Sequence, residues 1–340
     1  MATTLADVAA HAGVSVQTVS NALNNPALLK QATLDRVLAA VDSLGYSPNL
    51  QARRLRRRTV ATIGVRIEPT TDNIASSLLD RFLHEVTAQA DAQGQHVLLF
   101  TATSDEEEVG KIRELASQQV ADRFLLTSTH AGDARVPALL EAGMRFVAFG
   151  RPWGPAPTHS WVDVDGASGT RQATEALLDA GHRRIGFIGW PAGSGSGDDR
   201  RLGWSSALRE RLGLDDADLA ALTAVCGDQL QDATDAAAPL LERGVDALVC
   251  ASDSLATGSV GAALQAGRSL PVIGFDNTAL AAGVGFSSID QCLGEVASAA
   301  LAALDHEPGG VTTIVRPRLM RRQHDRWGIL PAADRGQSPT

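Results

Sequence analysis

Three short segments near the start of the chain carry apolar residues at helical spacing. Residues 5–12 place theirs at i, i+3, i+4 and i+7, which predicts a helix with one apolar stripe. Thr4 and Asp7 fit a capping box at its start, and Gly13 supplies the left-handed residue that ends such a helix. Similar stripes follow over residues 15–24 and 34–44. Two short helices joined by a glycine turn and braced by a third predict a helix-turn-helix head.

The second of these helices has an unusual number of uncharged hydrogen-bonding side chains. Ser15 can cap its start. Its polar side chains are Gln17, Thr18, Ser20, Asn21 and Asn24. In a helix-turn-helix the second helix lies in the major groove of DNA, where amide groups suit the edge of adenine and Val16 can contact a thymine methyl. The helix is therefore predicted to read DNA bases; the alternative is an ordinary solvated helix.

After Thr59 the pattern changes, and short apolar runs alternate with longer helical segments. The strand-like runs are Ala61–Ile67, His96–Phe100, Phe124–Thr127, Phe146–Phe149, Arg184–Ile188, Ala247–Cys250 and Pro271–Phe275. The helical segments between them include Leu78–Ala92, Gly169–Ala180, Leu202–Leu212 and Ala256–Ala266. This alternation predicts an α/β body with parallel sheets covered on both faces, in two lobes with a cleft between them.

Ligands of open parallel sheets bind beyond the carboxyl ends of the strands, and polar and aromatic residues follow several of the predicted strands. The effector-binding candidates are Asn73, Ser128, Arg151, Trp153, Trp190, Arg200, Asp253 and Asp276. Forked donors and carboxylates suit hydroxyl groups, and indole faces suit the apolar side of a sugar ring. The set predicts a polyhydroxylated ligand. Structural roles are the alternative: Asp276 can cap a helix, Ser128 can close a turn and Trp153 can pack in an interface.

Charge is unevenly divided along the chain. The 340 residues carry a net charge of −9, yet residues 1–60 hold seven basic and three acidic side chains. A small basic module ahead of an acidic body is typical of a domain that meets phosphate, joined to one that does not. Chance clustering is the alternative.

Five arginines, Arg53 among them, stand in SPNLQARRLRRR over residues 47–58. The segment is too short for a stable helix alone, because isolated helices below about 12 residues are marginal in water. Leu55 is a large apolar side chain among the arginines, which suits a wedge into a minor-groove base step. The segment is expected to order as a hinge helix on DNA beside a second copy; the alternative is a basic linker.

Several protein classes find no support in the sequence. No stretch reaches the roughly 20 apolar residues of a membrane span, and the start lacks the pattern of a secretory signal, so a cytoplasmic protein without a membrane partner is expected. The three cysteines are scattered, and no motif indicates a metal ion, a cofactor or a disulfide framework. The glycine-rich run over 192–200 does not fit a phosphate loop and is interpreted as a mobile loop leading to Arg200. An enzyme fused to a DNA-binding head is an alternative without positive support.

The N-terminal segments TLADVAAHAGVSVQTVSNALNNP and LGYSPNLQARRLR resemble the head and hinge of the LacI/GalR family of bacterial transcription regulators. The resemblance implies a homodimer whose two heads read a pseudo-palindromic operator in double-stranded DNA. It puts Val16, Gln17 and Asn21 at base-reading positions, although many relatives carry arginine where Asn21 stands, and it puts Leu55 at the hinge leucine. Positions that touch or support the phosphate backbone fall on Ser15, Asn24, Tyr46 and Asn49.

The body resembles the same family in three shorter motifs. RRLGW fits the family's R-x-x-G-[WF] and places the ligand-gripping arginine at Arg200, and VIGFDN places the pocket carboxylate at Asp276. CASDSLATG is similar to A-N-D-x-x-A-x-G, with Ser252 in place of asparagine and Asp253 kept. Residues 72–75 read DNIA where the family often has N-P-F-F. These features, with a GRPWG run similar to that of some sugar-responsive members, imply a carbohydrate effector.

The predicted organisation is a helix-turn-helix head over 1–46, a hinge helix over 47–58, a two-lobed periplasmic-binding-protein-like body over 59–330 and a polar tail over 331–340. The first lobe is expected to take 59–161 and 290–316, and the second 162–289 and 317–330. The expected function is ligand-responsive, sequence-specific regulation of transcription, as a repressor of carbohydrate-utilisation genes. The tail has no leucine heptads, which favours a dimer over a tetramer. A stand-alone two-lobed sugar-binding protein is the alternative.

Overall fold

The structure is a computed structural model of the chain and describes residues 3–24, 28–44, 62–67, 76–154, 158–306, 310–323 and 327–328. The chain forms two compact units, Met1–Val60 and Ala61–Thr340, which are described separately below as the head and the body. The predicted hinge helix and the predicted polar tail lie outside the described residues.

The described residues of the head form three helices around a small apolar core. They are α1 (Leu5–Ala12), α2 (Val16–Asn24) and α3 (Gln31–Ser43). The Thr4 hydroxyl accepts the Asp7 amide, and the Asp7 carboxylate accepts the Thr4 amide, so the predicted capping box is present. Gly13 has φ 64°, the left-handed backbone that glycine adopts without steric cost. One valine from each helix is fully buried: Val8, Val19 and Val37. The predicted helix-turn-helix arrangement is confirmed.

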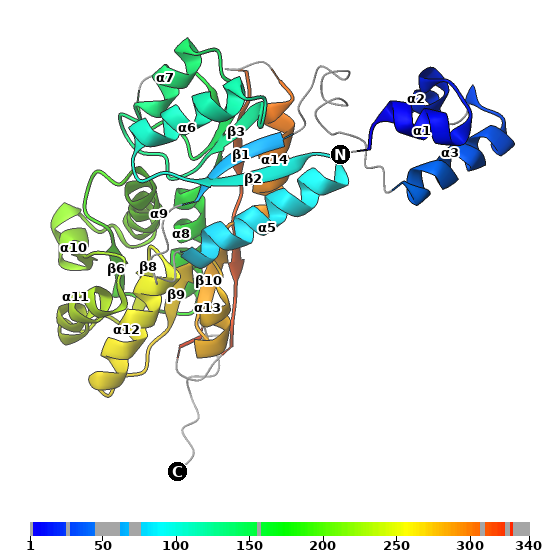
Figure 1. Cartoon of the computed structure of the whole chain (residues 1–340). Helices are drawn as coiled ribbons and strands as arrows, with labels where there is room; N and C mark the ends of the chain where they lie inside the picture. The colour runs from blue at the N-terminus through cyan, green and yellow to red at the C-terminus, as the bar shows by residue number, and fades with distance from the viewer. Residues whose placement is uncertain are drawn as a thin grey trace. The chain divides into compact units, whose positions relative to one another are not determined.

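Among the residues that the structure describes, the body contains two six-stranded sheets, one in each lobe (Figure 1). The first has the order β11-β5-β4-β3-β1-β2 and is parallel throughout; the second has the order β12-β10-β9-β8-β6-β7, and only its β10–β12 pair is antiparallel. The strands of the first sheet are β1 (Thr62–Ile67), β2 (His96–Thr101), β3 (Arg123–Leu126), β4 (Phe146–Phe149), β5 (Ser160–Val164) and β11 (Thr312–Val315). Those of the second are β6 (Ile185–Gly189), β7 (Thr223–Val225), β8 (Ala247–Cys250), β9 (Val272–Phe275), β10 (Ser287–Asp290) and β12 (Arg318–Met320). The predicted α/β fold with two parallel-sheet lobes is confirmed.

Helices cover both faces of each sheet. In the first lobe α5 (Ser76–Ala92) and α14 (Leu293–Leu304) cover one face, and α6 (Asp105–Ser117) and α7 (Arg135–Glu141) cover the other. Strand alternation divides the core, because Leu125 of β3 packs with the α5 and α14 side while Phe124 and Leu126 pack with the α6 and α7 side. The helices of the second lobe are α8 (Gly166–Asp179), α9 (Gly195–Leu212), α10 (Asp216–Ala221), α11 (Leu230–Glu242), α12 (Asp253–Gln265) and α13 (Ala279–Val284).

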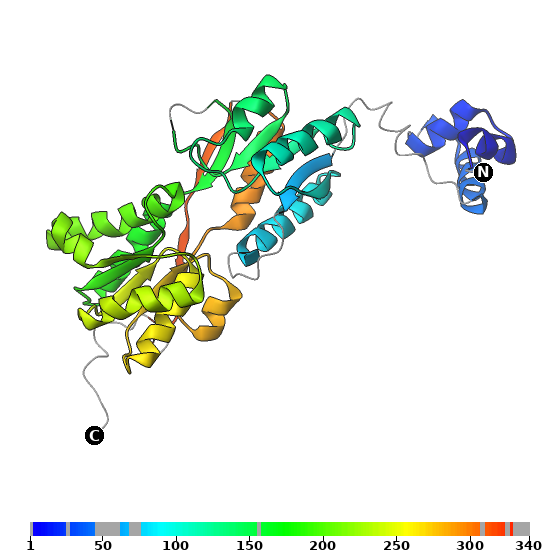
Figure 2. The same ribbon diagram turned by 60° about the vertical axis from the view of Figure 1, so that its left-hand side comes forward.

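The chain passes between the lobes after β5, after β10 and again between β11 and β12. Figures 1 and 2 both show the last extended segment running from one lobe into the other. The whole of β5 lies in the first sheet, so the first passage follows Val164. Parallel strands of both sheets therefore direct their carboxyl ends toward the junction of the lobes, where the predicted effector residues follow the strands.

Each predicted strand run is present within one residue at either end among the described residues, but five short strands were not predicted. These are β5, β7, β10, β11 and β12. The interpretation of residues 192–200 as a mobile loop was wrong, because α9 begins at Gly195. Ser194 caps this helix by accepting the amide of Gly197, and the Asp198 carboxylate accepts the amide of Gly193. None of the described helices is long and apolar enough to cross a membrane.

Candidate DNA-binding surface and effector pocket

The open face of α2 carries Val16, Gln17 and Asn21. Val16 is 49% exposed although it is apolar, and Gln17 is exposed as well. Gln17 Nε2 donates to Asn21 Oδ1 at 3.1 Å across one helical turn. The fold therefore brings the three predicted base-reading residues onto one face, where paired amides can both donate to and accept from a base edge.

The other two predicted residues at the start and centre of α2 have different surroundings. Ser15 stays exposed, and its hydroxyl accepts the amide of Thr18 at 3.1 Å, as expected of a helix N-cap. Ser20 is only 6% exposed, because it neighbours Val19 on the flank of α2 that packs into the head. The prediction that Ser20 faces DNA bases is corrected by this burial.

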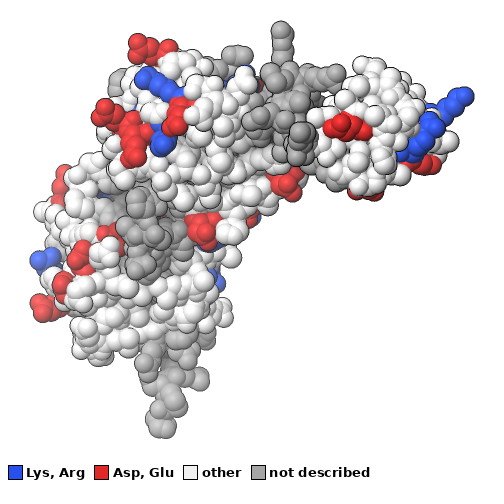
Figure 3. Space-filling model, viewed as in Figure 1, with Lys and Arg blue, Asp and Glu red and all other residues white. Residues whose placement is uncertain are grey.

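Several predicted contact residues fall outside the description of the structure. Tyr46, Asn49, Arg53 and Leu55 lie outside the described residues, as do the side chain of Asn24 and the effector candidate Asn73. Acidic side chains are scattered over the visible face of the body in Figure 3, so the described part of that face offers no broad basic surface to phosphate.

In the second lobe, Arg200 is buried at the centre of a cluster of polar and aromatic side chains, which forms the candidate effector site. Its guanidinium carbon is 3.8 Å from the ring centroid of Phe275 and 5.2 Å from that of Trp190. Its Nη1 donates to the carbonyl of Ala251 and lies 3.8 Å from Asp276 Oδ1. Burial lowers the pKa of Arg200, while the charge of Asp276 opposes that shift. The guanidinium of Arg200 is thus held in a fixed position against two flat aromatic rings.

The R-x-x-G-W motif explains how Arg200 is held there. Trp204 is buried and donates from Nε1 to the carbonyl of Ile185 at 3.1 Å, which anchors α9 to β6. A Cβ atom at Gly203 would lie 1.9 Å from the carbonyl oxygen of Ala167, so only glycine allows α8 and α9 this close approach. The glycine and tryptophan therefore set the position of the helix, and Arg200 projects from the preceding turn.

Asp276 follows β9 directly and has φ 108°. Gln291 Nε2 donates to its Oδ1 at 2.6 Å. Burial raises the pKa of Asp276 to about 7, although the charge of Arg200 favours ionisation. Burial disfavours the charge on both partners, so their attraction only partly offsets the loss of hydration.

A second carboxylate of this pocket, Asp228, was missed by the sequence analysis. Its Oδ1 accepts bonds from Ser252 Oγ at 2.5 Å and from Trp190 Nε1 at 3.2 Å. Burial raises the pKa of Asp228, and the bonds from Ser252 and Trp190 lower it. Asp228 comes just after β7, a three-residue edge strand whose sequence gives no clear strand pattern, so no predicted strand end indicates this carboxylate.

Asp253 does not face the pocket. It is fully buried, its Oδ2 accepts the amide and the hydroxyl of Thr278 at 2.7 and 2.8 Å, and its Oδ1 accepts Ser288 Oγ at 2.6 Å. Burial raises the pKa of Asp253 to about 6 against the effect of these bonds. The prediction that Asp253 binds the effector is corrected: its carboxylate ties the start of α12 to the segments that follow β9 and form β10.

Arg151 and Trp153 lie in the connection between β4 and β5, and both reach the second lobe. Arg151 Nε donates to Asp163 at 2.5 Å, and its Nη2 lies 3.3 Å from Asp199 of α9. The Arg151 guanidinium also lies over the Trp153 ring at 4.8 Å. A Cβ atom at Gly195 would lie 2.1 Å from the Trp153 indole, so this ring packs directly on the first turn of α9. Both predicted effector residues take part in contacts between the lobes.

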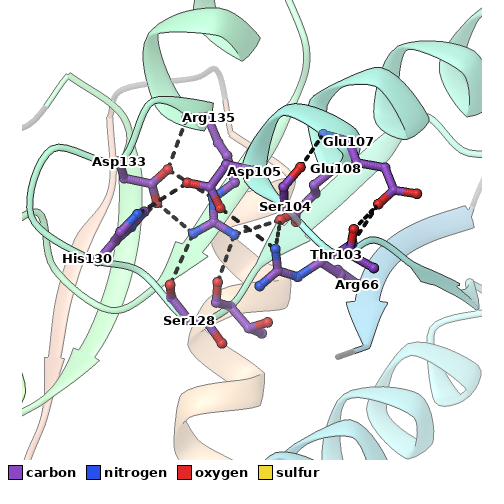
Figure 4. A network of polar contacts seen from close by, with 11 residues as sticks. Arg66, Thr103, Ser104, Asp105, Glu107, Glu108, Ser128, His130, Asp133 and Arg135 are labelled. Carbon is purple, nitrogen blue, oxygen red and sulfur yellow. Dashed lines mark hydrogen bonds and ion pairs between the residues drawn. The ribbon is translucent and has the colours of Figure 1, made fainter. Parts of the chain in front are cut away.

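Ser128 is exposed at the end of β3 and has φ 54°. Its loop is held by the buried side chain of Arg135, which donates to the carbonyls of Thr127 and Ser128 and pairs with Glu108 at 2.8 Å (Figure 4). Desolvation raises the pKa of Glu108. The network fixes the backbone of Ser128 at the edge of the sheet that faces the junction of the lobes.

Asp105, His130 and Asp133 lie close enough together to hold a metal ion. However, both oxygens of Asp133 accept bonds from Arg135, and Asp105 lies 3.8 Å from Arg66 and 3.7 Å from Arg135 (Figure 4). Two guanidinium groups already neutralise these carboxylates and would repel a cation. The geometry favours an ion-pair network.

Comparison with known proteins agrees with the two units. Residues 4–49 match the family model described as bacterial regulatory proteins, lacI family, and residues 77–311 match periplasmic binding proteins and sugar binding domain of LacI family. The HTH-type transcriptional regulator CelR of Thermobifida fusca is 34% identical over 287 residues, which cover 82% of this chain and 83% of CelR. The regulator GalS of Salmonella typhimurium is 32% identical over 290 residues, covering 82% and 81%. The chain belongs to the LacI family of bacterial regulatory proteins.

Solved structures of LacI-family proteins share the fold. A complex of the transcriptional regulator CelR with cellobiose superposes with a TM-score of 0.65 at 28% identity, covering 94% of this chain and 99% of that one. The Lac repressor dimer bound to operator and an anti-inducer gives a TM-score of 0.78 at 21% identity, covering 95% and 98%. This LacI-family chain is a DNA-binding transcriptional regulator with a sugar-binding type of body.

Proposed function

We propose that this LacI-family regulator is a homodimeric repressor of carbohydrate-utilisation genes. Each head reads one half of a pseudo-palindromic operator through Val16, Gln17 and Asn21. A sugar bound beside Arg200 and Asp276 sets the affinity for that operator. The observation that carries the proposal is a buried cluster of arginine, carboxylate and indole in the same chain as a pair of hydrogen-bonded amides on the open face of α2.

The chemistry of the pocket favours a neutral polyol over a charged or purely apolar ligand. Asp228 and Asp276 offer acceptors and Arg200 offers donors, while Trp190 and Phe275 offer flat apolar faces. A pyranose has hydroxyls around its rim and an apolar face of C–H groups, so it can satisfy both kinds of surface at once. The partial compensation between Arg200 and Asp276 leaves hydrogen-bonding capacity for those hydroxyls.

Cellobiose is the first ligand to test. The relative CelR and a solved CelR complex with cellobiose are both similar to this chain over most of its length. A disaccharide extends farther than one ring, and Trp153 offers a second indole at the junction of the lobes. Glucose, galactose and maltose serve as comparison ligands that differ in size, stereochemistry or linkage.

The finer arrangement of the repressor follows from the same proposal. The hinge over 47–58 orders on DNA, Leu55 inserts into the minor groove between the half-sites, and Arg53 contacts phosphate. Ser15, Asn24, Tyr46 and Asn49 support the backbone contacts, and Asn73 and Ser128 add first-lobe groups to the sugar site. The repressor works in the cytoplasm, where its operator DNA lies, with the head over 1–46 and the hinge over 47–58.

The DNA part is tested by selecting bound sequences from a randomised duplex pool and measuring their affinity by fluorescence anisotropy. The expected result is an inverted repeat of two half-sites, bound by two chains, with affinity that falls steeply between 50 and 200 mM salt. Failure to enrich any sequence at low salt would overturn the proposal. A flat dependence of affinity on salt would remove the arginine tract from the interface.

The ligand part is tested with the same duplex and the sugar panel. Thermal shift is expected to detect the binding sugar, because a ligand that binds only the folded state raises the melting temperature. Anisotropy is then expected to show changed operator affinity with that sugar present. Chromatography after long incubation separates a regulator from an enzyme, since a regulator returns the sugar unchanged. Operator binding indifferent to every sugar would contradict sugar control.

A further inference from the structure

Two consecutive residues after β9 adopt a left-handed backbone. Asp276 has φ 108° and Asn277 has φ 49°, and neither is glycine. Such residues persist where the surrounding contacts determine the backbone closely, and they cluster at switching and ligand-binding segments. The residues that contact Asp276 and Asn277 are therefore the ones that can change the conformation of this segment.

Contacts within the second lobe hold one side of the segment. The amide of Asp276 donates to the carbonyl of Ile289 at 2.8 Å, and the amide of Asn277 donates to Ser288 Oγ at 2.9 Å. The Asn277 side chain donates to Asp290 at 2.6 Å. These bonds attach the segment to β10 through two amides and one side chain, and they do not use the carbonyl oxygens of Asp276 and Asn277.

One side chain of the first lobe donates hydrogen bonds to both of those carbonyls. Arg81 projects from the first turns of α5, and its Nη1 donates to the carbonyl of Asp276 at 3.0 Å and to that of Asn277 at 2.9 Å. The helix itself is fixed to the first lobe, because it packs on α14 and Gln89 of α5 donates to the carbonyl of Gly294 at 3.0 Å. A single nitrogen thus joins α5 to the segment that follows β9.

The side chain of Asp276 belongs to the candidate effector site, whereas its backbone carbonyl bonds to Arg81. Its carboxylate accepts Gln291 and lies 3.8 Å from Arg200, while its carbonyl accepts Arg81. A ligand that bonds to the carboxylate fixes the orientation of this residue and hence of its carbonyl. We propose that Arg81 is the positioning residue that transmits the state of the sugar pocket to α5, through its two bonds to the Asp276 and Asn277 carbonyls.

The proposal rests on the proposed function and specifies how it is regulated. A ligand shifts an equilibrium between two lobe arrangements only if it interacts differently with each. The Arg81 bonds join the two lobes, so they are made in the arrangement seen here and lost when the lobes move apart. Linkage requires the effect to be reciprocal: the sugar changes operator affinity by the factor by which operator changes sugar affinity.

The chain offers a closely matched control. Arg113 of α6 also donates a guanidinium bond to a carbonyl, that of Ala138 at 3.1 Å, but both partners belong to the first lobe. Arg81→Gln and Arg113→Gln each remove one such arginine, and only the first breaks a connection between lobes. Arg81→Lys tests whether one donor nitrogen that bonds to both carbonyls is enough, because the lysine ammonium can donate to both as one guanidinium nitrogen does.

The first measurement is the ratio of operator dissociation constants with and without saturating cellobiose, in the full-length chain. Arg81→Gln is expected to lower this ratio at least tenfold, which corresponds to about 1.4 kcal/mol of coupling, while operator affinity without sugar changes little. Arg81→Lys is expected to recover part of the ratio, and Arg113→Gln to keep the wild-type value. An unchanged ratio in Arg81→Gln, or an equal loss in Arg113→Gln, would overturn the proposal.

The second measurement needs neither ligand nor DNA. Hydrogen exchange of the Asn277 and Thr278 amides is expected to be several-fold faster in Arg81→Gln than in wild type and unchanged in Arg113→Gln. If wild type ignores cellobiose and every other sugar of the panel, the proposed sugar control fails, and the exchange rates still decide whether Arg81 links the lobes. Equal exchange in wild type and Arg81→Gln would refute the link even if sugar control is real.

Discussion

The indole ring of Trp153, on the β4–β5 connection of the first lobe, packs directly on the backbone of Gly195 at the start of α9 in the second lobe. A Cβ atom at Gly195 would lie 2.1 to 2.3 Å from three atoms of that ring. Arg151 reinforces the contact, because it stacks over Trp153 and pairs with Asp199 of the same helix. The two lobes are therefore held together on this side by a glycine that no other residue can replace without movement.

Gly195→Ala is expected to force the lobes apart and weaken cellobiose binding at least tenfold. The added methyl group cannot coexist with the Trp153 ring, so the lobe arrangement seen here becomes less favourable. Isothermal titration measures the change. Gly110→Ala is the control, since Gly110 lies in α6 with open space around its Cβ position. In a Trp153→Ala background the alanine at 195 should have little further effect, and a full additional loss there would show that the clash is elsewhere.

Arg200→Ala is expected to abolish the response to sugar while leaving operator binding intact. The substitution removes the guanidinium that lies 3.8 Å from the Asp276 carboxylate and opens the stack on Phe275. The neighbouring Arg201→Ala is a close control, because Arg201 is a partly exposed arginine paired with Asp198 on the same helix. Anisotropy with and without cellobiose measures both variants. A normal sugar response in Arg200→Ala would exclude this arginine from the site.

Asp253→Asn and Asp276→Asn are expected to have opposite effects. Asp253 accepts three buried hydrogen bonds, and an amide nitrogen in its place would face the donors of Thr278, so unfolding should become easier by about 1–3 kcal/mol. The folded fraction should still bind cellobiose. Asp276→Asn should keep or raise the melting temperature and lose sugar affinity. Thermal denaturation and titration with cellobiose check both variants. If Asp253→Asn lost sugar affinity without losing stability, Asp253 would have to contact the sugar.

The sequence was most informative where local chemistry decides structure. The head's caps, its glycine turn and its apolar stripes all involve residues a few positions apart, so they could be predicted. The apolar runs of the buried strands were predictable for the same reason, since parallel strands covered on both faces are apolar throughout. Short strands with polar residues, such as β5 and β10, gave no comparable signal, because their pairing depends on neighbours far along the chain.

In the candidate effector site, too, some residues could be predicted from local sequence and others depend on distant contacts. Arg200 and Asp276 could be placed from strand ends and motif spacing, and the structure puts them 3.8 Å apart. Asp253 follows a strand in the same way, but whether such a carboxylate faces a ligand or the protein depends on Thr278 and Ser288, which no local pattern connects to it. Ser20 is the corresponding case in the head, where packing against neighbouring helices decides its exposure.

Stability in the absence of ligand is expected to depend on pH through Asp276. Its pKa in the folded protein is about 7, against an ordinary 3.8, because burial disfavours its charge. Between these values the folded protein keeps a proton that the unfolded chain releases, so the free energy of unfolding falls as pH rises from about 4 to 7. The term is fully present below the unfolded pKa and lost above pH 7.

Melting temperatures at pH 5 and pH 8 for wild type and Asp276→Asn measure this term. The asparagine side chain of the variant does not titrate, so the melting temperature of the variant should exceed that of wild type by more at pH 8 than at pH 5. Asp228, Asp253 and Arg200 surround the site in both proteins, and their own pKa shifts largely cancel in the comparison. A pH-independent difference would mean that Asp276 stays ionised throughout this range.

Gln17→Ala is expected to weaken operator binding by about 1–3 kcal/mol, the usual contribution of a good contact to a base edge. Gln17 is exposed and bonds only to Asn21 among the contacts described for the head, so the stability of the head should not change. Gln31→Ala is the matched control, because Gln31 makes the same kind of bond to Asp35 one turn on, but from the start of α3. Anisotropy on the selected operator and on a scrambled duplex separates base reading from phosphate contact. If Gln17 reads bases, the Gln17→Ala variant loses affinity for the operator but not for the scrambled duplex. Equal losses on both duplexes, or an equal loss in Gln31→Ala, would show that α2 does not read sequence through this side chain.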